Sequence, residues 1–333
     1  MPDVYLTFDV GGTRIKSGLV EERGAILARR TVPTEGERGA DDLIGRLVAV
    51  GHDLCHDLRP DDRLRAIGIA FTGVIDPERG VVLQLNGKIP DIAGVEVGPR
   101  LSAAFGIPAW IDNDTRVYTV GEWQYGAGRG HGDVVCITIG TGIGSGVVTR
   151  GRLMHTRGMV GGILGGHLTV DVNGPLCSCG NRGCLESVAS VPAFLAFIRD
   201  HLARGCSSQL ADQAGPGGSA LSAEMVLEQV RVGDELATFA FERWTRHIGA
   251  GLVTLIHVHD PDVVIVGGGI LHQADIILPP IQAYVQRHAW TWPKGRTLVR
   301  AAELGDDAAL IGGAALARLQ IETDIAESSM GTT

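Results

Sequence analysis

The chain has 333 residues, of which 44% are hydrophobic and 20% charged, a length and balance typical of a globular protein with two domains. Its net charge of -9, with no basic stretch, disfavours a nucleic-acid partner. It has no apolar run of membrane-spanning length and no basic segment at its start, so we expect neither a membrane anchor nor a secretory signal. Six cysteines in a chain of this length do not indicate a disulfide framework, and we expect a protein of the reducing cytoplasm.

The predicted elements alternate between strands and helices. In chain order, we expect strands at 4–10, 16–20, 64–70, 109–111, 134–139, 145–148 and 262–266, and helices at 41–58, 117–125, 223–257 and 308–319. The stretch 205–218 is rich in Ser, Gln, Ala and Gly and is predicted to be a surface loop. This alternation predicts an α/β fold with mixed sheets.

Two segments share a pattern of strand, glycine-threonine turn and strand, which indicates a duplicated domain. The first turns at Gly11-Gly12-Thr13 and the second at Gly140-Thr141-Gly142. Glycine lets backbone N–H groups converge on a phosphate without obstruction, and threonine adds a hydroxyl donor. Asp9, just before the first turn, can hold Mg²⁺ through water. The alternative is two ordinary hairpins, and neither turn is a Walker A loop, because no Gly-Lys-Ser/Thr ending follows.

An acidic cluster, Asp112-Asn113-Asp114, stands where a predicted strand ends and a helix begins. A hydroxyl that attacks a phosphate needs a carboxylate to accept its proton, which makes Asp114 the candidate general base. The neighbouring Asn113 amide can orient the hydroxyl. The alternative is a helix N-cap, for which Asp and Asn are favoured residues.

A short cysteine-rich stretch predicts a structural metal site. His167 precedes Cys177, Cys179 and Cys184, and one imidazole with three thiolates is a donor set of tetrahedral zinc. The second ring nitrogen of His167 needs a partner of its own, either a hydroxyl of a bound ligand or Glu186. The alternative is a group of thiols without a metal, although closely packed exposed thiols oxidise readily.

A third glycine turn, Gly267-Gly268-Gly269, follows the strand predicted at 262–266. Here the backbone can lie against an adenine ring, because glycine has no side chain to keep the ring away. Glycines also follow strands in any α/β protein, so an ordinary turn is the alternative.

Taken together, these residues resemble the ROK family of repressors, uncharacterised reading frames and sugar kinases, in the actin-like ATPase superfamily. The resemblance covers nearly the whole chain. The segments that carry it are 9–13 with 18–20, Asn113-Asp114 with Gly121-Glu122, 140–144, 166–167 with 177–186, 266–269 and 305–308.

The resemblance implies two actin-like lobes with mixed β-sheets flanked by helices, and a cleft between them where ATP and a hexose meet. The expected small lobe spans 1–113, with a C-terminal helix at about 306–325 packed back on it. The expected large lobe spans 114–305 and contains the zinc site. ATP, Mg²⁺ and a structural Zn²⁺ are the implied cofactors, and a homodimer is the implied assembly.

The expected site residues fall into four groups. They are Asp114 as the general base; Asn113, Asn86, Gly73, Glu186, His167 and Leu164 on the sugar; Asp9, Gly11, Gly12, Thr13, Gly140, Thr141, Gly142, Gly268 and Gly269 on the nucleotide and its Mg²⁺; and His167, Cys177, Cys179 and Cys184 on zinc.

Four departures from the family pattern lie in or near the sugar side. Leu164 stands where the family's sugar kinases have a Glu that accepts hydrogen bonds from sugar hydroxyls, and an unpaired buried hydroxyl costs about 1–3 kcal/mol. Thr72-Gly73 replaces Pro-Gly, the segment 86–90 lacks a Trp, and Arg116 replaces a second Asn. The phosphate turns and the cysteine cluster are intact, so we expect phosphoryl transfer to a changed acceptor.

The leading expectation is therefore an ATP-dependent kinase of a hexose, with glucose as the default on family grounds. Another epimer, an amino sugar or a cyclitol is the alternative acceptor, and a catalytically weak sugar sensor is the alternative function. A sugar-responsive repressor would carry an N-terminal winged helix, for which we expect no room before the strand at 4–10.

Overall fold

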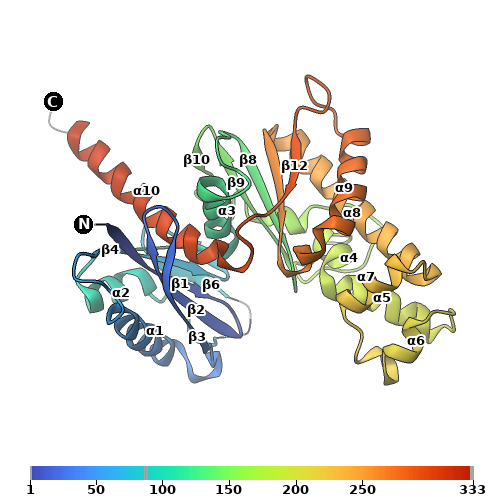
Figure 1. The fold of residues 1–333 in the computed structure, drawn as a ribbon, viewed down its shortest axis with the longest axis horizontal. Helices are drawn as coiled ribbons and strands as arrows, with labels where there is room; N and C mark the ends of the chain where they lie inside the picture. Colours follow the sequence, from blue (N-terminus) through green and yellow to red (C-terminus); the bar gives the residue numbers. More distant parts are fainter. Residues whose placement is uncertain (1, 86, 88, 331–333) are drawn as a thin grey trace.

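The structure is a computed structural model that describes residues 2–85, 87 and 89–330 (Figure 1). The N-terminal part of the chain forms one five-stranded mixed sheet and the C-terminal part forms another. The predicted α/β class with mixed sheets is confirmed. Asn86, one of the expected sugar contacts, lies outside the described residues.

The first sheet has the strand order β3-β2-β1-β4-β7. Its strands are β1 (Asp3–Val10), β2 (Arg14–Glu21), β3 (Ile26–Pro33), β4 (Arg63–Phe71) and β7 (Ala109–Asn113). Its apolar residues pack on one face against α1 (Ala40–Cys55) and α2 (Val97–Phe105), and on the other against α10 (Ala308–Met330). A small hairpin of β5 (Val74–Asp76) and β6 (Val81–Gln84) follows β4.

The second sheet has the order β10-β9-β8-β11-β12. Its strands are β8 (Val134–Ile139), β9 (Ile143–Thr149), β10 (Arg152–Leu153), β11 (Val263–Gly267) and β12 (Leu298–Ala301). The main core lies between this sheet and α4 (Leu185–Ala189), α5 (Val191–Ala203), α7 (Ala223–Arg231), α8 (Glu235–His259) and α9 (Ala274–His288). Helix α3 (Asp114–Tyr125) packs on the opposite face and follows directly on β7 of the first sheet.

The two sheets have the same topology. In each, an antiparallel hairpin (β1-β2 or β8-β9) continues into two parallel neighbours (β4 and β7, or β11 and β12). This agrees with the duplication that the repeated strand-turn-strand pattern predicted. Both β1 and β8 are covered on both faces, so they are nearly continuous buried apolar runs rather than alternating ones.

Helix α10 lies directly against the first sheet and against α3 because glycines meet at both contacts. A Cβ on Gly68 of β4 would clash with the carbonyl group of Gly313, and a Cβ on Gly121 of α3 would clash with the Ala308 carbonyl. The predicted helix at 308–319 thus uses its small residues for backbone-to-backbone packing, and it continues beyond the predicted end to Met330.

Three predicted elements need correction. Helix α3 begins at Asp114 rather than at 117, because Asn113 caps it. The predicted helix at 223–257 is two helices, α7 and α8, and Asp234 between them caps α8 by accepting a hydrogen bond from the Ala237 N–H. The predicted loop at 205–218 contains a short helix, α6 (Leu210–Gln213), and a 3-10 turn, η3 (Pro216–Gly218).

Several elements were not predicted at all. They are β3, β12, α2, α5 and α9, besides the short β5, β6, β10 and α4 and the 3-10 turns η1 (Gly36–Arg38), η2 (Leu164–His167), η4 (Gly269–Gln273) and η5 (Gly305–Asp307). Two of them carry misleading local signals. Strand β3 has two consecutive arginines and no fully buried residue, and α9 contains Pro279 and Pro280, which argue against a helix interior.

Among the described residues, no helix combines the length and the apolar character needed to cross a membrane. The division into lobes at residues 113 and 114 remains a prediction. It falls at the junction of β7 and α3, which is also where the acidic cluster lies.

Candidate active site

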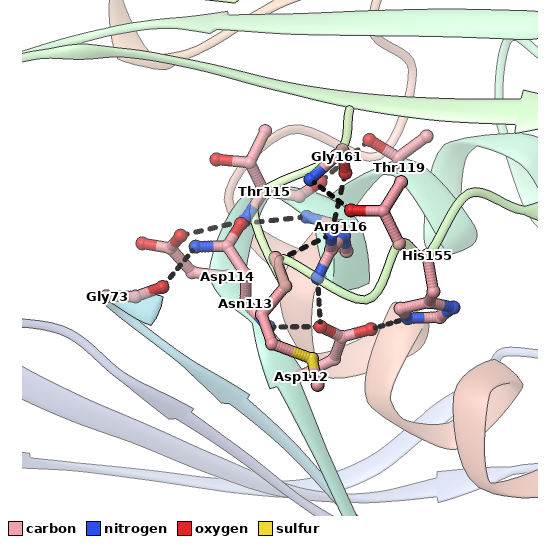
Figure 2. A network of polar contacts seen from close by, with 11 residues as sticks. Gly73, Asp112, Asn113, Asp114, Thr115, Arg116, Thr119, His155 and Gly161 are labelled. Atoms are coloured by element: carbon pink, nitrogen blue, oxygen red, sulfur yellow. Dashed lines mark hydrogen bonds and ion pairs between the residues drawn. The ribbon is translucent and has the colours of Figure 1, made fainter. Parts of the chain in front are cut away.

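The acidic cluster is held at the end of β7 by its own helix cap. The Asn113 side-chain oxygen accepts hydrogen bonds from the backbone N–H groups of Thr115 (3.0 Å) and Arg116 (3.3 Å), as an N-cap does (Figure 2). Its amide nitrogen donates to the Gly73 carbonyl at 3.0 Å. The N-cap interpretation of this cluster is therefore correct for Asn113, and it leaves the Asp114 carboxylate free for another role.

Asp114 is tied to the end of β1 through a threonine. The Thr72 hydroxyl donates to the Asp114 carboxylate at 3.0 Å, and the Thr72 backbone N–H donates to the carbonyl of Val10, the last residue of β1, at 3.4 Å. Burial raises the pKa of Asp114, and the hydrogen bonds from Thr72 and Thr115 oppose that rise. A carboxylate with a raised pKa is a stronger proton acceptor. Thr72 was noticed in the sequence only as a departure from a family pattern, and its contact with Asp114 was not foreseen.

The second glycine turn reaches the same place from the other sheet. A Cβ on Gly144 of β9 would clash with the Thr115 hydroxyl, so the start of β9 lies directly against the first turn of α3. Gly11 and Gly140 both close their turns by backbone hydrogen bonds, to the Arg14 carbonyl (3.1 Å) and the Gly142 carbonyl (2.9 Å). The two turns therefore flank the residues next to Asp114, one from each sheet.

The third glycine turn lies against the end of β8. Gly268 has a φ of 103°, and a Cβ there would clash with the Ile139 carbonyl, so only glycine fits. Next to it is a cavity of about 380 Å³, lined by Gly140, Thr141, Gly269 and by apolar and polar residues of α5, α7 and η4. Cβ atoms on Gly140 and Gly269 would meet nothing within 4 Å, so both backbones face open space.

A smaller cavity of about 110 Å³ connects this turn to the first sheet. It is lined by Asp9, Lys16, Tyr118, Gly268, Gly269, His272, Gly305, Asp306 and Ala309. Burial raises the pKa of Asp9 to about 6, with Lys16 lowering it and the charge of Asp114 raising it further. The coupling between Asp9 and Asp114 indicates that the two carboxylates share one electrostatic environment.

The four donors of the cysteine cluster come together. His167, at the end of η2, and Cys177, Cys179 and Cys184 offer ligand atoms that all lie within 4.8 Å of one another. The His167 Nδ1 is 3.5 Å from the Cys177 Sγ, and the Sγ atoms of Cys179 and Cys184 are 3.6 Å apart. A tetrahedron with zinc–sulfur bonds of about 2.3 Å separates its donors by about 3.8 Å, so this donor set has the right chemistry and spacing for zinc.

Two expected sugar contacts have distinctive surroundings. Glu186, in the first turn of α4, accepts a hydrogen bond from the Ile143 N–H at 2.9 Å, and so joins α4 to the second glycine turn. No hydrogen bond between Glu186 and His167 occurs in the part of the chain that the structure describes, so this partner for the second ring nitrogen is not realised. Leu164, the first residue of η2, is 45% exposed.

The comparisons with known proteins agree with this geometry. A profile described as the ROK family matches residues 5–320. The chain is 35% identical over 322 residues to a glucokinase of Thermotoga maritima, with 96% of this chain and 99% of that one covered. It is similar to the crystal structure of a ROK family glucokinase from Streptomyces griseus in complex with glucose and AMPPNP, at 31% identity and a TM-score of 0.79, covering 95% of this chain and 99% of that one.

A regulator is among the structural relatives too. The chain is similar to a ROK family transcriptional regulator, a homologue of the E. coli Mlc protein, at 26% identity and a TM-score of 0.83, covering 95% of this chain and 78% of that one. The fold is therefore the actin-like α/β fold predicted from the sequence. Since the family profile spans nearly all of its residues, the chain belongs to the ROK family.

Proposed function

We propose that this protein is an ATP-dependent sugar kinase that phosphorylates a hexose, with Asp114 as the general base. The observation that carries the proposal is the placement of the Asp114 carboxylate. Thr72 ties it to the end of β1, and Thr115 packs beside it against Gly144 of the second hairpin. The kinase relatives, at 31–35% identity over nearly the full chain, support this function over a sensor without activity.

In the proposed reaction, an oxygen of an acceptor hydroxyl attacks the γ-phosphorus of ATP. The new P–O bond forms as the bond to the β–γ bridging oxygen breaks, and ADP leaves. Asp114 accepts the hydroxyl proton late in the step, while Asn113 orients the hydroxyl. Little covalent chemistry is asked of the protein, so positioning and charge stabilisation by the backbone of the two glycine turns account for most of the catalysis.

A cavity beside the third glycine turn supports a nucleotide site there. The cavity of about 380 Å³ has apolar walls from Leu195 and Ile270 and polar groups from Arg199 and Glu224, which suits an adenine ring. Gly140, Thr141 and Gly269 line the same cavity, so phosphates that continue from it run toward the second turn. Bound Mg²⁺ would neutralise phosphate charge, and Asp9 is placed to hold it through water.

Zinc is the metal that best fits the cysteine cluster. Three sulfurs and one imidazole nitrogen within 4.8 Å of one another are a closed structural donor set, with no place left for a reacting water. The site would join η2, which contains Leu164, to α4, which contains Glu186. We therefore assign it to holding the acceptor side of the site in place rather than to chemistry.

We also propose that the protein works as a homodimer in the cytoplasm and without a nucleic-acid partner. The family resemblance supports the dimer. The net charge of -9 supports the absence of nucleic acid, and the six cysteines, free in the structure, suit a reducing compartment.

A coupled kinase assay tests the function directly. Wild-type protein is given ATP, Mg²⁺ and, in turn, glucose, other hexoses, hexosamines and cyclitols, and ADP release is followed. We expect turnover on glucose, the sugar bound by the Streptomyces griseus relative. Turnover on a different acceptor would correct the substrate, and nucleotide binding without turnover on any acceptor would overturn the kinase in favour of a sensor.

Restoring a carboxylate at position 164 is expected to improve sugar binding. The Leu164 side chain cannot accept a hydrogen bond from a sugar hydroxyl, and an unmet buried hydroxyl costs about 1–3 kcal/mol. Leu164→Glu should therefore lower the KM for the hexose by about tenfold, with kcat little changed. Leu298→Glu, at a similarly exposed leucine on β12, is the matched control. A Leu164→Glu enzyme with an unchanged or higher KM would show that this position does not face the sugar.

The activity should fall on the acid side of about pH 6 because Asp9 must be ionised to hold Mg²⁺. Burial raises its pKa to about 6, above the ordinary range of an aspartate, so the folded protein binds a proton there more tightly than the unfolded chain does. Below about pH 6, kcat/KM for MgATP should drop about tenfold per pH unit. The measurement is a pH profile at saturating sugar, with the affinity for Mg²⁺ followed in parallel. A profile that stays flat down to about pH 5 would contradict the role of Asp9.

A further inference from the structure

A buried charged network lies behind the acidic cluster and takes no part in the chemistry proposed above. Asp112 and Arg116 flank the Asn113-Asp114 pair, and both side chains are almost fully buried, at 0% and 1% exposure. The Arg116 guanidinium is 3.1 Å from one Asp112 oxygen, and the His155 Nε2 is 2.6 Å from the other (Figure 2). Burying such a pair costs desolvation energy, so the network is better explained by the geometry it imposes than by stability.

Arg116 also reaches into a distant loop. Its other terminal nitrogen donates to the backbone carbonyls of Met159 (2.9 Å) and Gly161 (2.6 Å). One planar guanidinium thus joins the strand end that positions Asp114 to two residues that follow Arg116 by 43 and 45 positions in the chain.

The other hydrogen bonds of Met159 and Gly161 are made within the loop, where their N–H groups donate to the Thr156 carbonyl (2.8 Å) and the Thr156 hydroxyl oxygen (3.1 Å). Met159 has a φ of 61°, a left-handed conformation that a methionine adopts only when its surroundings enforce it. On one side the loop borders a cavity of about 780 Å³, whose lining includes Trp110, His155, Arg157 and Met159. This side of the loop borders a cavity, and the carbonyl contacts with Arg116 tie Met159 and Gly161 to the strand end at Asp114.

The loop leads directly to the acceptor side of the site. Three residues beyond Gly161, the chain enters η2 at Leu164, and η2 ends at His167. Gly162 is anchored separately, by the Ser145 hydroxyl, which donates to its carbonyl at 2.6 Å. The segment 159–164 is therefore held between two fixed points, Arg116 on the side of the base and Ser145 on the side of the second hairpin.

We infer that Arg116 is a positioning residue for the acceptor: it holds the segment 159–164 at a fixed separation from Asp114. This inference rests on the proposed kinase function. Asp112, which is itself held by His155, accepts a hydrogen bond from the guanidinium and so helps to keep it aligned with the two carbonyls. The consequence is that Arg116, whose side chain is only 1% exposed, governs how well the acceptor binds.

Arg116→Met tests this, because methionine fills the space but cannot donate. We expect the acceptor KM to rise between about tenfold and about a hundredfold, since small misplacements in a site have effects of that size, while the affinity for a non-hydrolysable ATP analogue stays unchanged. Amide hydrogen exchange in peptides covering 154–168 should become faster. Arg116→Lys keeps the charge beside Asp112 but cannot contact two carbonyls as well, so its KM should lie between those of Arg116→Met and wild type.

Arg296→Met is the matched control. Arg296 also bridges a carboxylate, that of Asp262 at 2.9 Å, and a backbone carbonyl, that of Asp260 at 2.7 Å, but it lies beside β11 and β12. We expect that variant to lose stability and to keep the acceptor KM.

Two results would overturn the inference: an unchanged acceptor KM in folded Arg116→Met, or an equal loss of acceptor and nucleotide affinity, which would indicate a general structural defect. If Arg116→Met does not fold, Arg116→Lys decides, and an unchanged KM there overturns the inference. A wild-type protein that binds nucleotide but phosphorylates no acceptor would remove the kinase function itself and the inference with it. That result can be told apart from failure of the inference alone, in which the wild type is active and its acceptor KM does not change when Arg116 is substituted.

Discussion

Asp114→Asn is expected to lower kcat by between about two and four orders of magnitude while the fold and sugar binding stay largely intact. Asparagine has nearly the same shape as aspartate. Its single side-chain oxygen can still accept the hydrogen bond from the Thr115 N–H, which is 2.8 Å long in the wild type, and its amide nitrogen can donate to the Thr72 hydroxyl oxygen, which lies 3.0 Å from the carboxylate. What it cannot do is accept a proton from the acceptor hydroxyl. The loss should therefore appear in turnover and not in the KM for the sugar.

The measurement is steady-state kinetics with glucose and MgATP, together with the melting temperature. Asp234→Asn is the matched control, because Asp234 is also buried but caps α8 far along the chain, and asparagine is an equally good cap. That control should keep wild-type turnover. An Asp114→Asn enzyme with normal turnover would remove Asp114 from its role as the base.

Cys184→Ser is expected to abolish metal binding and to destabilise the protein strongly. Cys184 is fully buried and stands at the start of α4, so the metal would tie that helix to η2 through His167. A serine hydroxyl is a poor ligand for zinc, and three remaining donors leave the tetrahedron open. Loss of a structural metal belongs to the changes that cost about 4 kcal/mol or more, which for a chain of this size lowers the Tm by at least roughly 6 °C.

Metal content per chain and the Tm are the two measurements. Cys206→Ser, at an exposed thiol outside the cluster, is the control and should match the wild type in both. The acceptor KM of Cys184→Ser should also rise, because Leu164 and His167 belong to the element that the metal holds. Wild-type metal content and Tm in Cys184→Ser would mean that the cluster is a group of thiols without a structural metal.

The parts of the site that sequence could predict are those whose chemistry lies within a few consecutive residues. The turns at Gly11 and Gly140, the donor set that ends at Cys184 and the strand end at Asp114 are local patterns. The structure brings the four metal donors together, ties Asp114 to Thr72 and places Gly140 beside a cavity. These motifs could be recognised because residue type and short spacing carry them, although hairpins, a helix cap and free thiols were alternatives. The family assignment followed from the same residues and is confirmed.

The parts that sequence could not predict depend on contacts between distant segments. Nothing near Thr72 indicates that its hydroxyl reaches Asp114, because that contact exists only once β4 and β7 pair in parallel. Arg116 shows the same limit. Its position in the chain marks it as a departure from a family pattern, but its partners Met159 and Gly161 come from a loop of the other sheet.

Residue types and their spacing were enough to predict the kinds of chemistry expected here: glycine turns suited to phosphate, a candidate base and a Cys/His donor set suited to zinc. These predictions depend on residue type and short-range spacing, because a turn or a donor cluster forms from residues that are close together in the chain. How those parts are set against one another depends on the folded chain, in which Thr72 contacts Asp114 and Arg116 joins the end of β7 to the loop before Leu164. The physical reason is that a buried charge or hydroxyl must find its partner wherever packing brings one, and packing is settled by the whole fold.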